Sequence, residues 1–371
     1  MEGGTTMKCN KNKIFCVIFA VFLLIMSVGN LVIPKDEFSE SERRPLAAFP
    51  EFSGTTVLNG KFMSKMEEYA VDNYPFRDFF RRIKALSNRY LFGQQDNNGI
   101  YLSGDYAATM EYPLHEDSID YAAEKFRYLY ETYFAQSEGN VYLSVIPDKS
   151  YFMAEKEGKL RLDYEKMITQ LRDSMEYATY IDIFGDLQLE DYYKTDTHWR
   201  QEKILDVAEK LANAMGTQLT GSYTENTLDR DFYGVYYGQS ALPLQPEKIH
   251  YLTSDILDQC KVYDLQNEKE STVYDMEKAY GKDAYEMFLS GSISLMTIEN
   301  PNASNDRELV VFRDSFGSSI TPLLVSGYSK ITLVDIRYLP SAYLSRFVEF
   351  ENQDVLFLYS TSVLNNSDTL K

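Results

Sequence analysis

The apolar run from Ile14 to Ile33 is the feature that most limits how this chain can fold, because it matches the roughly 20 residues that a helix needs to cross a bilayer core. Lysines precede the run and acidic residues follow it, a bias that places the N-terminus in the cytoplasm and the chain after Pro34 outside. A cleaved signal peptide is the competing interpretation, but the run is long and no small-residue cleavage pattern follows it. We therefore expect residues 1–35 to form a cytoplasmic tail and an uncleaved membrane anchor through residues 14–33. The flanking charges are Lys8, Lys11, Lys13, Asp36, Glu37, Glu40 and Glu42.

Cysteine usage indicates the compartment. Cys9 and Cys16 lie in or beside the apolar run, which leaves Cys260 alone in the part expected outside, where no internal disulfide can form. An exported domain of this size without disulfides is typical of a bacterial cell envelope rather than of a secreted eukaryotic protein. The expected location is a bacterial cell membrane, crossed once, with the larger part of the chain extracytoplasmic.

Net charge excludes one class of partner. The 37 Lys+Arg against 56 Asp+Glu give a formal charge of −19, which repels phosphate backbones, so we expect no nucleic-acid partner. The 30 tyrosines and 22 phenylalanines offer rings that can stack on sugars, although such residues more often fill a core. With 371 residues, 44% of them hydrophobic, the chain can bury one large core or two smaller ones.

Residues 36–95 are predicted to connect the anchor to the folded domain. Asp36 to Thr56 is polar and acidic, with two prolines and no period, as in an extended tether. Lys61 to Phe92 has helical spacing that Pro75 interrupts, which predicts a stalk of two short helices. Basic residues on the second helix leave two interpretations open, contact with anionic lipid or a solvated face. They are Arg77, Arg81, Arg82, Lys84 and Arg89.

From residue 96 to residue 371, short apolar runs alternate with helical patterns, which predicts an α/β domain with three layers and a mainly parallel sheet. The segment 216–299 is less regular and rich in Tyr, Ser and Gly, so it is predicted as a possible insertion that shapes the substrate surface. The predicted strands are 141–146, 178–183, 308–312, 331–336 and 354–359. The predicted helices are 117–135, 164–177 and 202–215.

Two short stretches carry the residues of an acyl-transfer site. Asp196, His198 and Ser315 supply a carboxylate, an imidazole and a hydroxyl. Ser315 follows the predicted strand 308–312, so it should emerge at the carboxyl edge of a parallel sheet, where ligands bind. Asp196 and His198 are two apart and share one side of an extended loop, where a carboxylate can fix the imidazole tautomer. Trp199 is expected to wall the site or to pack beneath the ring.

The backbone after the serine is a second source of chemistry. Phe316, Gly317 and Ser318 can turn sharply and present N–H groups to a developing oxyanion. Pro322 indicates that the regular helix begins near Ser319 rather than at Ser315, which would leave Ser315 on an exposed turn.

Two other interpretations of these residues remain. A zinc site needs at least three protein ligands, and only Asp196 and His198 lie together, because the other two histidines and Cys260 occur in unrelated contexts. We expect no metal, and with no glycine-rich phosphate loop in the sequence we expect no cofactor. His198 and Ser315 can also be a hydrogen-bonded structural histidine and a helix-entry serine.

Seven motifs, in order along the chain, resemble those of the DHHW proteins of bacterial envelopes and of the related SGNH hydrolase-like domain of the alginate acetylation proteins AlgX and AlgJ. Each motif alone is unspecific, but together they cover nearly the whole exported part. They are residues 72–77 (DNYPFR), 98–102 (NGIYL), 145–149 (VIPDK), 196–199 (DTHW), 232–234 (FYG), 313–316 (RDSF) and 334–338 (VDIRY).

The resemblance implies an SGNH-like fold in which Ser315 is the nucleophile, His198 the general base and Asp196 its orienter. Such proteins pass an acetyl group to a polysaccharide outside the cell, usually after a membrane-bound O-acyltransferase has moved it across the bilayer. A glycan and such a membrane enzyme are therefore the expected partners. The sequence departs from the family name at Thr197, where His is called for, although the alginate proteins also tolerate Thr.

Gly291 and Ser292 stand where relatives have Gly-Asn near the oxyanion site, which puts the second oxyanion donor in doubt. Together with Phe316, Trp199 and Arg313, they are the candidate oxyanion or substrate residues.

The expected function is a membrane-anchored O-acetyltransferase or esterase that acts on a polysaccharide or peptidoglycan-type glycan. Transfer and hydrolysis share the acyl-enzyme and differ in which hydroxyl attacks it. The alternative is a non-catalytic protein that binds glycan or scaffolds a polysaccharide modification or export complex.

Overall fold

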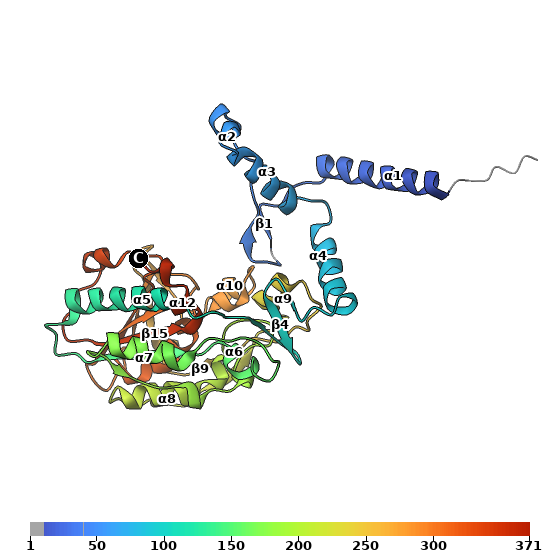
Figure 1. Ribbon diagram of the computed structural model, residues 1–371. Helices are drawn as coiled ribbons and strands as arrows, with labels where there is room; N and C mark the ends of the chain where they lie inside the picture. The colour runs from blue at the N-terminus through green and yellow to red at the C-terminus, as the bar shows by residue number, and fades with distance from the viewer. Residues whose placement is uncertain (1–10, 40) are drawn as a thin grey trace, which may run out of the picture. The chain divides into compact units, whose positions relative to one another are not determined.

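A computed structural model describes residues 11–39 and 41–371, which fall into two compact units, Met1–Gln94 and Gln95–Lys371 (Figure 1). The predicted cytoplasmic tail, including Lys8 and Cys9, and the flanking Glu40 lie outside the described residues.

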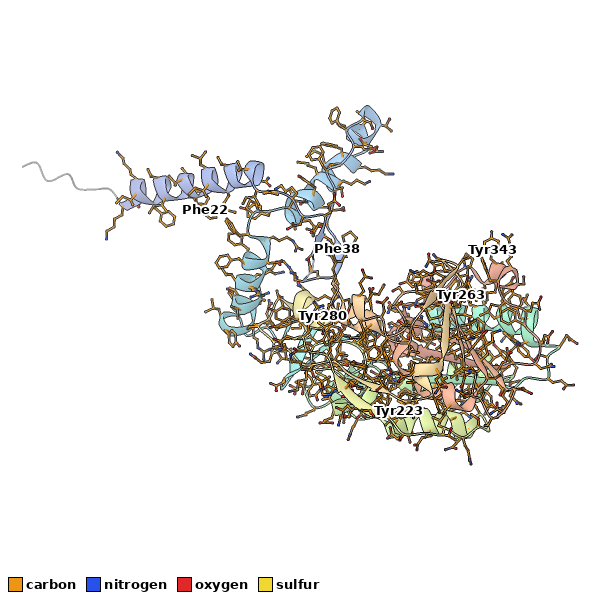
Figure 2. All side chains as sticks on the ribbon, turned by 180° about the vertical axis from the view of Figure 1, so that it is seen from behind. Phe22, Phe38, Tyr223, Tyr263, Tyr280 and Tyr343 are labelled. Carbon is orange, nitrogen blue, oxygen red and sulfur yellow. The ribbon has the colours of Figure 1, made fainter. Side chains whose placement is uncertain are left out.

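The first unit contains the apolar helix α1. Its residues Lys11–Asn30 have a mean hydropathy of 2.2, and the helix is long and apolar enough to cross a membrane. Its side chains, Phe22 among them, are mostly exposed and project from both sides of the helix (Figure 2). The segment predicted as a tether forms a short antiparallel strand pair and a first helical turn, and two longer helices follow on either side of Pro75. The elements are α1 (Lys11–Val32), β1 (Phe38–Ser39), β2 (Arg44–Pro45), α2 (Gly54–Leu58), α3 (Lys61–Asp72) and α4 (Arg77–Leu86), and a π-helical turn (Ser87–Leu91) extends α4.

The second unit is built on an eight-stranded sheet in the order β11-β10-β12-β14-β13-β15-β6-β7. The run from β14 to β7 is parallel, as predicted, whereas β12, β10 and β11 are added antiparallel at one edge. The strands are β6 (Val141–Ile146), β7 (Thr179–Tyr180), β10 (Lys261–Asp264), β11 (Lys269–Ser271), β12 (Leu295–Glu299), β13 (Glu308–Arg313), β14 (Lys330–Val334) and β15 (Asp354–Ser360).

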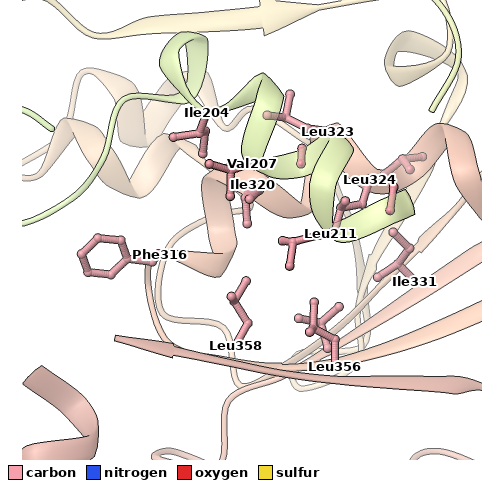
Figure 3. Packing of buried hydrophobic residues seen from close by; sticks show 14 of the residues in the cluster. Ile204, Val207, Leu211, Phe316, Ile320, Leu323, Leu324, Ile331, Leu356 and Leu358 are labelled. Carbon is pink, nitrogen blue, oxygen red and sulfur yellow. The ribbon is translucent and has the colours of Figure 1, made fainter. Parts of the chain in front are cut away.

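Helices cover both faces of this sheet and complete the predicted three layers. Along β13, Leu309 and Val311 belong to the core under α8 and α11, whereas Val310 and Phe312 belong to the core under α5 and α7. Figure 3 shows the first core, where Leu211 of α8 and residues of α11 face strand residues. The helices are α5 (Glu116–Leu129), α6 (Ser150–Met153), α7 (Tyr164–Ser174), α8 (Leu205–Ala214), α9 (Val235–Ser240), α10 (Met276–Ala279), α11 (Gly317–Leu324) and α12 (Thr361–Asn365).

Smaller sheets lie beside the central one. One is three-stranded and the other is a strand pair within the segment 216–299. That segment, predicted as a possible insertion, also supplies β10, β11 and β12, so it extends the central sheet. It contains the half-buried Cys260, whose Sγ donates to the Ile256 carbonyl at 3.2 Å and whose thiol pKa is raised by burial to about 11. The small-sheet strands are β3 (Asp96–Asn97), β4 (Ile100–Ser103), β5 (Tyr106–Thr109), β8 (Thr224–Thr227) and β9 (His250–Thr253).

Two local predictions were wrong in detail. The strand expected at 178–183 is only two residues long, because the chain leaves the sheet after one hydrogen bond from Ile181 to Leu143 and enters a 3₁₀ turn. Helix α11 begins at Gly317 rather than near Ser319, and Ser315 is half-buried rather than exposed. Every residue of α11 is buried, so tertiary packing outweighs the local preference of Pro322 for a first turn.

Candidate active site

A tight loop carries Asp196 and His198. Its ends meet in an antiparallel bridge between Tyr192 and Trp199, and the Tyr193 N–H donates to the His198 carbonyl at 3.0 Å. The loop is therefore held by backbone hydrogen bonds on both sides of the two side chains.

The Asp196 carboxylate is fully buried and has a partner on each oxygen. Oδ1 lies 2.6 Å from His198 Nδ1 and accepts the His198 backbone N–H at 3.2 Å, whereas Oδ2 accepts the Val235 N–H at 2.9 Å. Gly234 makes the last contact possible, since an added Cβ there would lie 2.2 Å from the Thr195 carbonyl oxygen and 2.3 Å from the Asp196 nitrogen. The carboxylate is thus fixed in the direction of the imidazole.

Ser315 follows the carboxyl end of β13, and its Oγ lies 2.8 Å from His198 Nε2. The neighbouring Asp314 carboxylate holds this turn, because it accepts the Phe316 N–H at 3.0 Å and the Ser360 N–H at 2.8 Å. The turn is therefore tied to the end of β15 as well. One consequence is that the Phe316 N–H, a predicted oxyanion donor, is bound to a carboxylate in this structure.

Two aromatic rings enclose the imidazole. The Tyr285 ring stacks on His198 with centroids 3.8 Å apart and an interplanar angle of 10°, and the Phe316 centroid is 4.9 Å away. The Tyr285 hydroxyl lies 2.8 Å from Ser319 Oγ, which also accepts from Trp199 Nε1 at 2.9 Å. Burial raises the pKa of Tyr285 well above its ordinary value, so its hydroxyl stays neutral. No motif singled out Tyr285, because the segment 216–299 contains many tyrosines in no recognisable pattern.

Lys149 lies behind the loop and is the last residue of the 145–149 motif, to which the sequence assigns no role at the site. Its Nζ donates to the carbonyl oxygens of Tyr193 at 2.8 Å and Lys194 at 3.1 Å. Burial lowers the pKa of Lys149 to about 7, and the carboxylates of Asp196 and Glu247 oppose that shift. The side chain therefore fastens the two residues that lead into the loop, and a sequence pattern gives no sign of this contact.

Arg313, Gly291 and Ser292 form a separate contact. Arg313 is buried, its guanidinium donates to the Ile293 carbonyl at 3.2 Å and the Gly291 carbonyl at 3.4 Å, and it lies 3.7 Å from the Asp335 carboxylate. Burial lowers the pKa of Arg313. Gly291 has a φ of 74° in the turn before β12, and Ser292 is exposed. Arg313 thus links β13 to this turn. Phe316 packs against the His198 ring, and Trp199 binds Ser319, which also contacts the Tyr285 hydroxyl.

The site combines a carboxylate, an imidazole and a hydroxyl in one hydrogen-bonded series, an arrangement that can generate a serine nucleophile. Within residues 11–39 and 41–371, no group of three or more His, Cys, Asp or Glu side chains is placed to hold a metal ion.

Comparison with known proteins gives structural matches. No family model and no curated protein matches the chain. A DHHW family protein from Eubacterium siraeum has a TM-score of 0.59 at 20% identity, covering 74% of this chain and 95% of its own. Bacillus cereus PatB1 has a TM-score of 0.57 at 18% identity, covering 71% of this chain and 96% of its own. Its structure with a sulfonyl adduct has a TM-score of 0.56 at 19% identity, covering 71% of this chain and 97% of its own. The O-acetyltransferase domain of Pseudomonas putida AlgJ has a TM-score of 0.45 at 13% identity, covering 72% of this chain and 92% of its own.

The class that these observations define is a three-layer α/β protein with a serine, histidine and aspartate grouped at the carboxyl edge of its sheet. More particularly, the fold is shared with a DHHW family protein and with PatB1. The resemblance read from the sequence motifs is confirmed at the level of the fold.

Proposed function

We propose that this chain is a membrane-anchored, extracytoplasmic O-acyltransferase or esterase acting on a cell-envelope glycan, with Ser315 as nucleophile, His198 as base and Asp196 as its orienter. The hydrogen-bonded series that joins the three side chains carries the proposal. Its two distances, 2.6 Å and 2.8 Å, lie within the reach expected of a general base and its partner.

Each step follows from this order of groups. His198 takes the Ser315 proton as Oγ bonds to the acyl carbonyl carbon, and the donor's leaving group departs with that proton. A glycan hydroxyl, or water, then attacks the acyl-enzyme and gives its proton to His198. The proton returns to Oγ as the serine is released, so no further reactant is required.

The exposed Tyr233 supports a sugar acceptor. Tyr233 precedes Gly234, which lies against the Thr195–Asp196 backbone, and its exposed ring lies 4.6 Å from that of Tyr237. Aromatic faces of this kind stack on sugar rings. In this proposal, α1 anchors the chain and a membrane-bound O-acyltransferase supplies the acyl group, as the sequence resemblance implies.

Covalent labelling tests the nucleophile. PatB1 has been solved with a sulfonyl adduct, and we expect phenylmethylsulfonyl fluoride to sulfonylate Ser315 Oγ with loss of fluoride. Peptide mass spectrometry should locate the adduct in the unchanged protein and find none in Ser315→Ala. The exposed Ser222 provides a matched control, because Ser222→Ala should label as the unchanged protein does.

Hydrolysis of an activated acetyl ester, with and without an acceptor oligosaccharide, tests the reaction. Ser315→Ala and His198→Ala should each lower the rate by about 10³-fold or more. His250→Ala is the matched control, because His250 also pairs with a carboxylate, Glu225 at 2.6 Å. Acetylated oligosaccharide would identify a transferase, and free acetate alone an esterase. Equal rates in all variants would favour the non-catalytic, glycan-binding alternative.

A further inference from the structure

Helix α4 and its π-helical extension carry an apolar stripe. Its residues are spaced three or four apart, so they lie on one face of the helix. All of them are exposed, which is unusual for a contiguous apolar face in water and marks an interaction surface. The stripe consists of Phe79 (59% exposed), Ile83 (43%), Leu86 (37%) and Tyr90 (71%).

The opposite side of α4 is occupied by its own unit. Ala85 is buried, Arg77 pairs with Glu42, and Arg81 lies 3.1 Å from the same carboxylate. These contacts fix the rotation of the helix about its axis. The apolar stripe therefore lies on the side of α4 away from Glu42, and only its first residue, Phe79, also lines a pocket with residues of the 33–46 and 72–78 segments.

The start of α4 is held at the carboxyl end of α1. Lys35 Nζ donates to the Asn73 carbonyl at 2.8 Å in the bend that leads into α4. Gly29 of α1 also faces Pro75, since an added Cβ would lie 3.6 Å from the proline ring. From this bend α4 departs from the line of α1 (Figure 1). A membrane-spanning α1 would therefore place the beginning of α4 at the bilayer surface.

Charge favours the same location. The chain has a formal net charge of −19, yet α4 and its extension are basic, with Asp78 as their one acidic residue. Arg82 and Arg89 border the stripe by their helical spacing. Amphipathic helices with basic and aromatic residues lie in the bilayer interface, where basic side chains contact anionic headgroups. The basic residues are Arg77, Arg81, Arg82, Lys84 and Arg89.

We infer that α4 is an interfacial helix that lies on an anionic bilayer surface, with the apolar stripe at the boundary between headgroups and acyl chains and with Arg82 and Arg89 at lipid phosphates. This inference rests on the membrane anchoring by α1 that is part of the proposed function. Of the two interpretations of the basic residues that the sequence leaves open, it adopts contact with anionic lipid.

Tryptophan fluorescence in the full chain tests this location. Trp199 is the sole tryptophan and is fully buried, so the unchanged protein supplies the background. The protein is placed in vesicles of phosphatidylcholine with phosphatidylglycerol, and emission is compared with brominated lipids. Phe79→Trp should be quenched about twofold or more by bromines near the headgroups. Phe22→Trp in α1 should be quenched by deep bromines, and the exposed Glu67→Trp in α3 should not be quenched.

The outcomes separate the possible occupants of the stripe. Quenching of Phe22→Trp without quenching of Phe79→Trp would overturn the interfacial helix and leave the anchor standing. Blue-shifted emission in that case would identify a protein surface, the second unit or another copy, as the occupant. Absence of quenching in both would overturn the anchor together with the inference. Ester hydrolysis by the same vesicles, compared with Ser315→Ala, judges the acyl-transfer proposal separately.

The headgroup contact has its own test. Adding Arg82→Gln and Arg89→Gln to the Phe79→Trp protein should reduce quenching in vesicles with phosphatidylglycerol and leave quenching in pure phosphatidylcholine unchanged. Equal quenching before and after these substitutions in both vesicle types would overturn the role of the two arginines.

Discussion

At the scale of single residues, the His198 ring is contacted on its face as well as at its edge. The edge nitrogens bind Asp196 and Ser315, and the face stacks on Tyr285. An aromatic face attracts a cation by about 0.5–2 kcal/mol, so in the proposed mechanism this stacking would stabilise the imidazolium formed as Ser315 attacks the acyl group.

We therefore expect Tyr285→Leu to lower kcat for ester hydrolysis by about 2- to 30-fold. Tyr285→Phe keeps the ring, loses only the hydrogen bond to Ser319 and should lower kcat less. Steady-state kinetics of both variants, with Tm as a check of folding, decide the matter. Equal losses in the two variants would assign the effect to the hydroxyl rather than to the ring.

Gly234 has a steric role beside Asp196. Gly234→Ala would drive a Cβ into the Thr195–Asp196 backbone, so we expect a loss of about 1–3 kcal/mol of unfolding free energy together with a fall in ester hydrolysis. Chemical denaturation and rate measurements check this. Gly185→Ala is the control, because no atom lies within 4 Å of a Cβ there. An unchanged rate in Gly234→Ala would show that the loop tolerates displacement.

Lys149 should make stability depend on pH. Its pKa is lowered from 10.5 to about 7, so between these values the unfolded chain binds a proton that the folded chain does not. Stability contributed by this group therefore rises as pH rises through that window. Denaturation of the unchanged protein and of Lys149→Met at several pH values should show this rise reduced in the variant. Parallel curves would mean that the buried amine keeps its proton.

At the scale of elements, the turn between β13 and α11 depends on Asp314, whose carboxylate joins the ends of β13 and β15. An amide at this position has one oxygen, so Asp314→Asn turns an N–H donor toward one of the two backbone N–H groups. We expect a loss of about 1–3 kcal/mol of unfolding free energy. Thermal unfolding measures this, and an unchanged Tm would show that the turn is held without the second acceptor.

The buried parallel strands could be predicted from the sequence. The runs at β6, β13 and β15 are almost wholly apolar and end at Pro147, Asp314 and Ser360. The apolar pattern and the residues that end each run therefore indicate the same strands. The position of Ser315 at the sheet edge follows from the same reasoning.

The antiparallel edge strands β10 and β11 could not be predicted in this way. β10 alternates exposed and buried residues and β11 is largely polar, so neither has the apolar run of a buried strand. Tyr285 stands in no motif, and the 145–149 motif contains Lys149 without indicating its contact, because both contacts with the site join segments distant in sequence and arise only from the tertiary fold.

At the scale of the whole molecule, the division into Met1–Gln94 and Gln95–Lys371 predicts independent folding. The second unit contains both hydrophobic cores and the complete series of site residues. We expect residues 95–371 alone to unfold cooperatively and to hydrolyse the activated ester at the rate of the full chain. Circular dichroism and kinetics check this, and a molten or inactive fragment would contradict it.

Cys260 gives this unit a chemical property of practical use. Because burial raises its thiol pKa to about 11, almost no thiolate forms near neutral pH, and thiolate is the form that alkylates or exchanges with disulfides. The single thiol of residues 95–371 should therefore remain reduced and unreactive in oxidising surroundings. A cysteine introduced on their surface would take up a maleimide probe selectively, without removal of the native one.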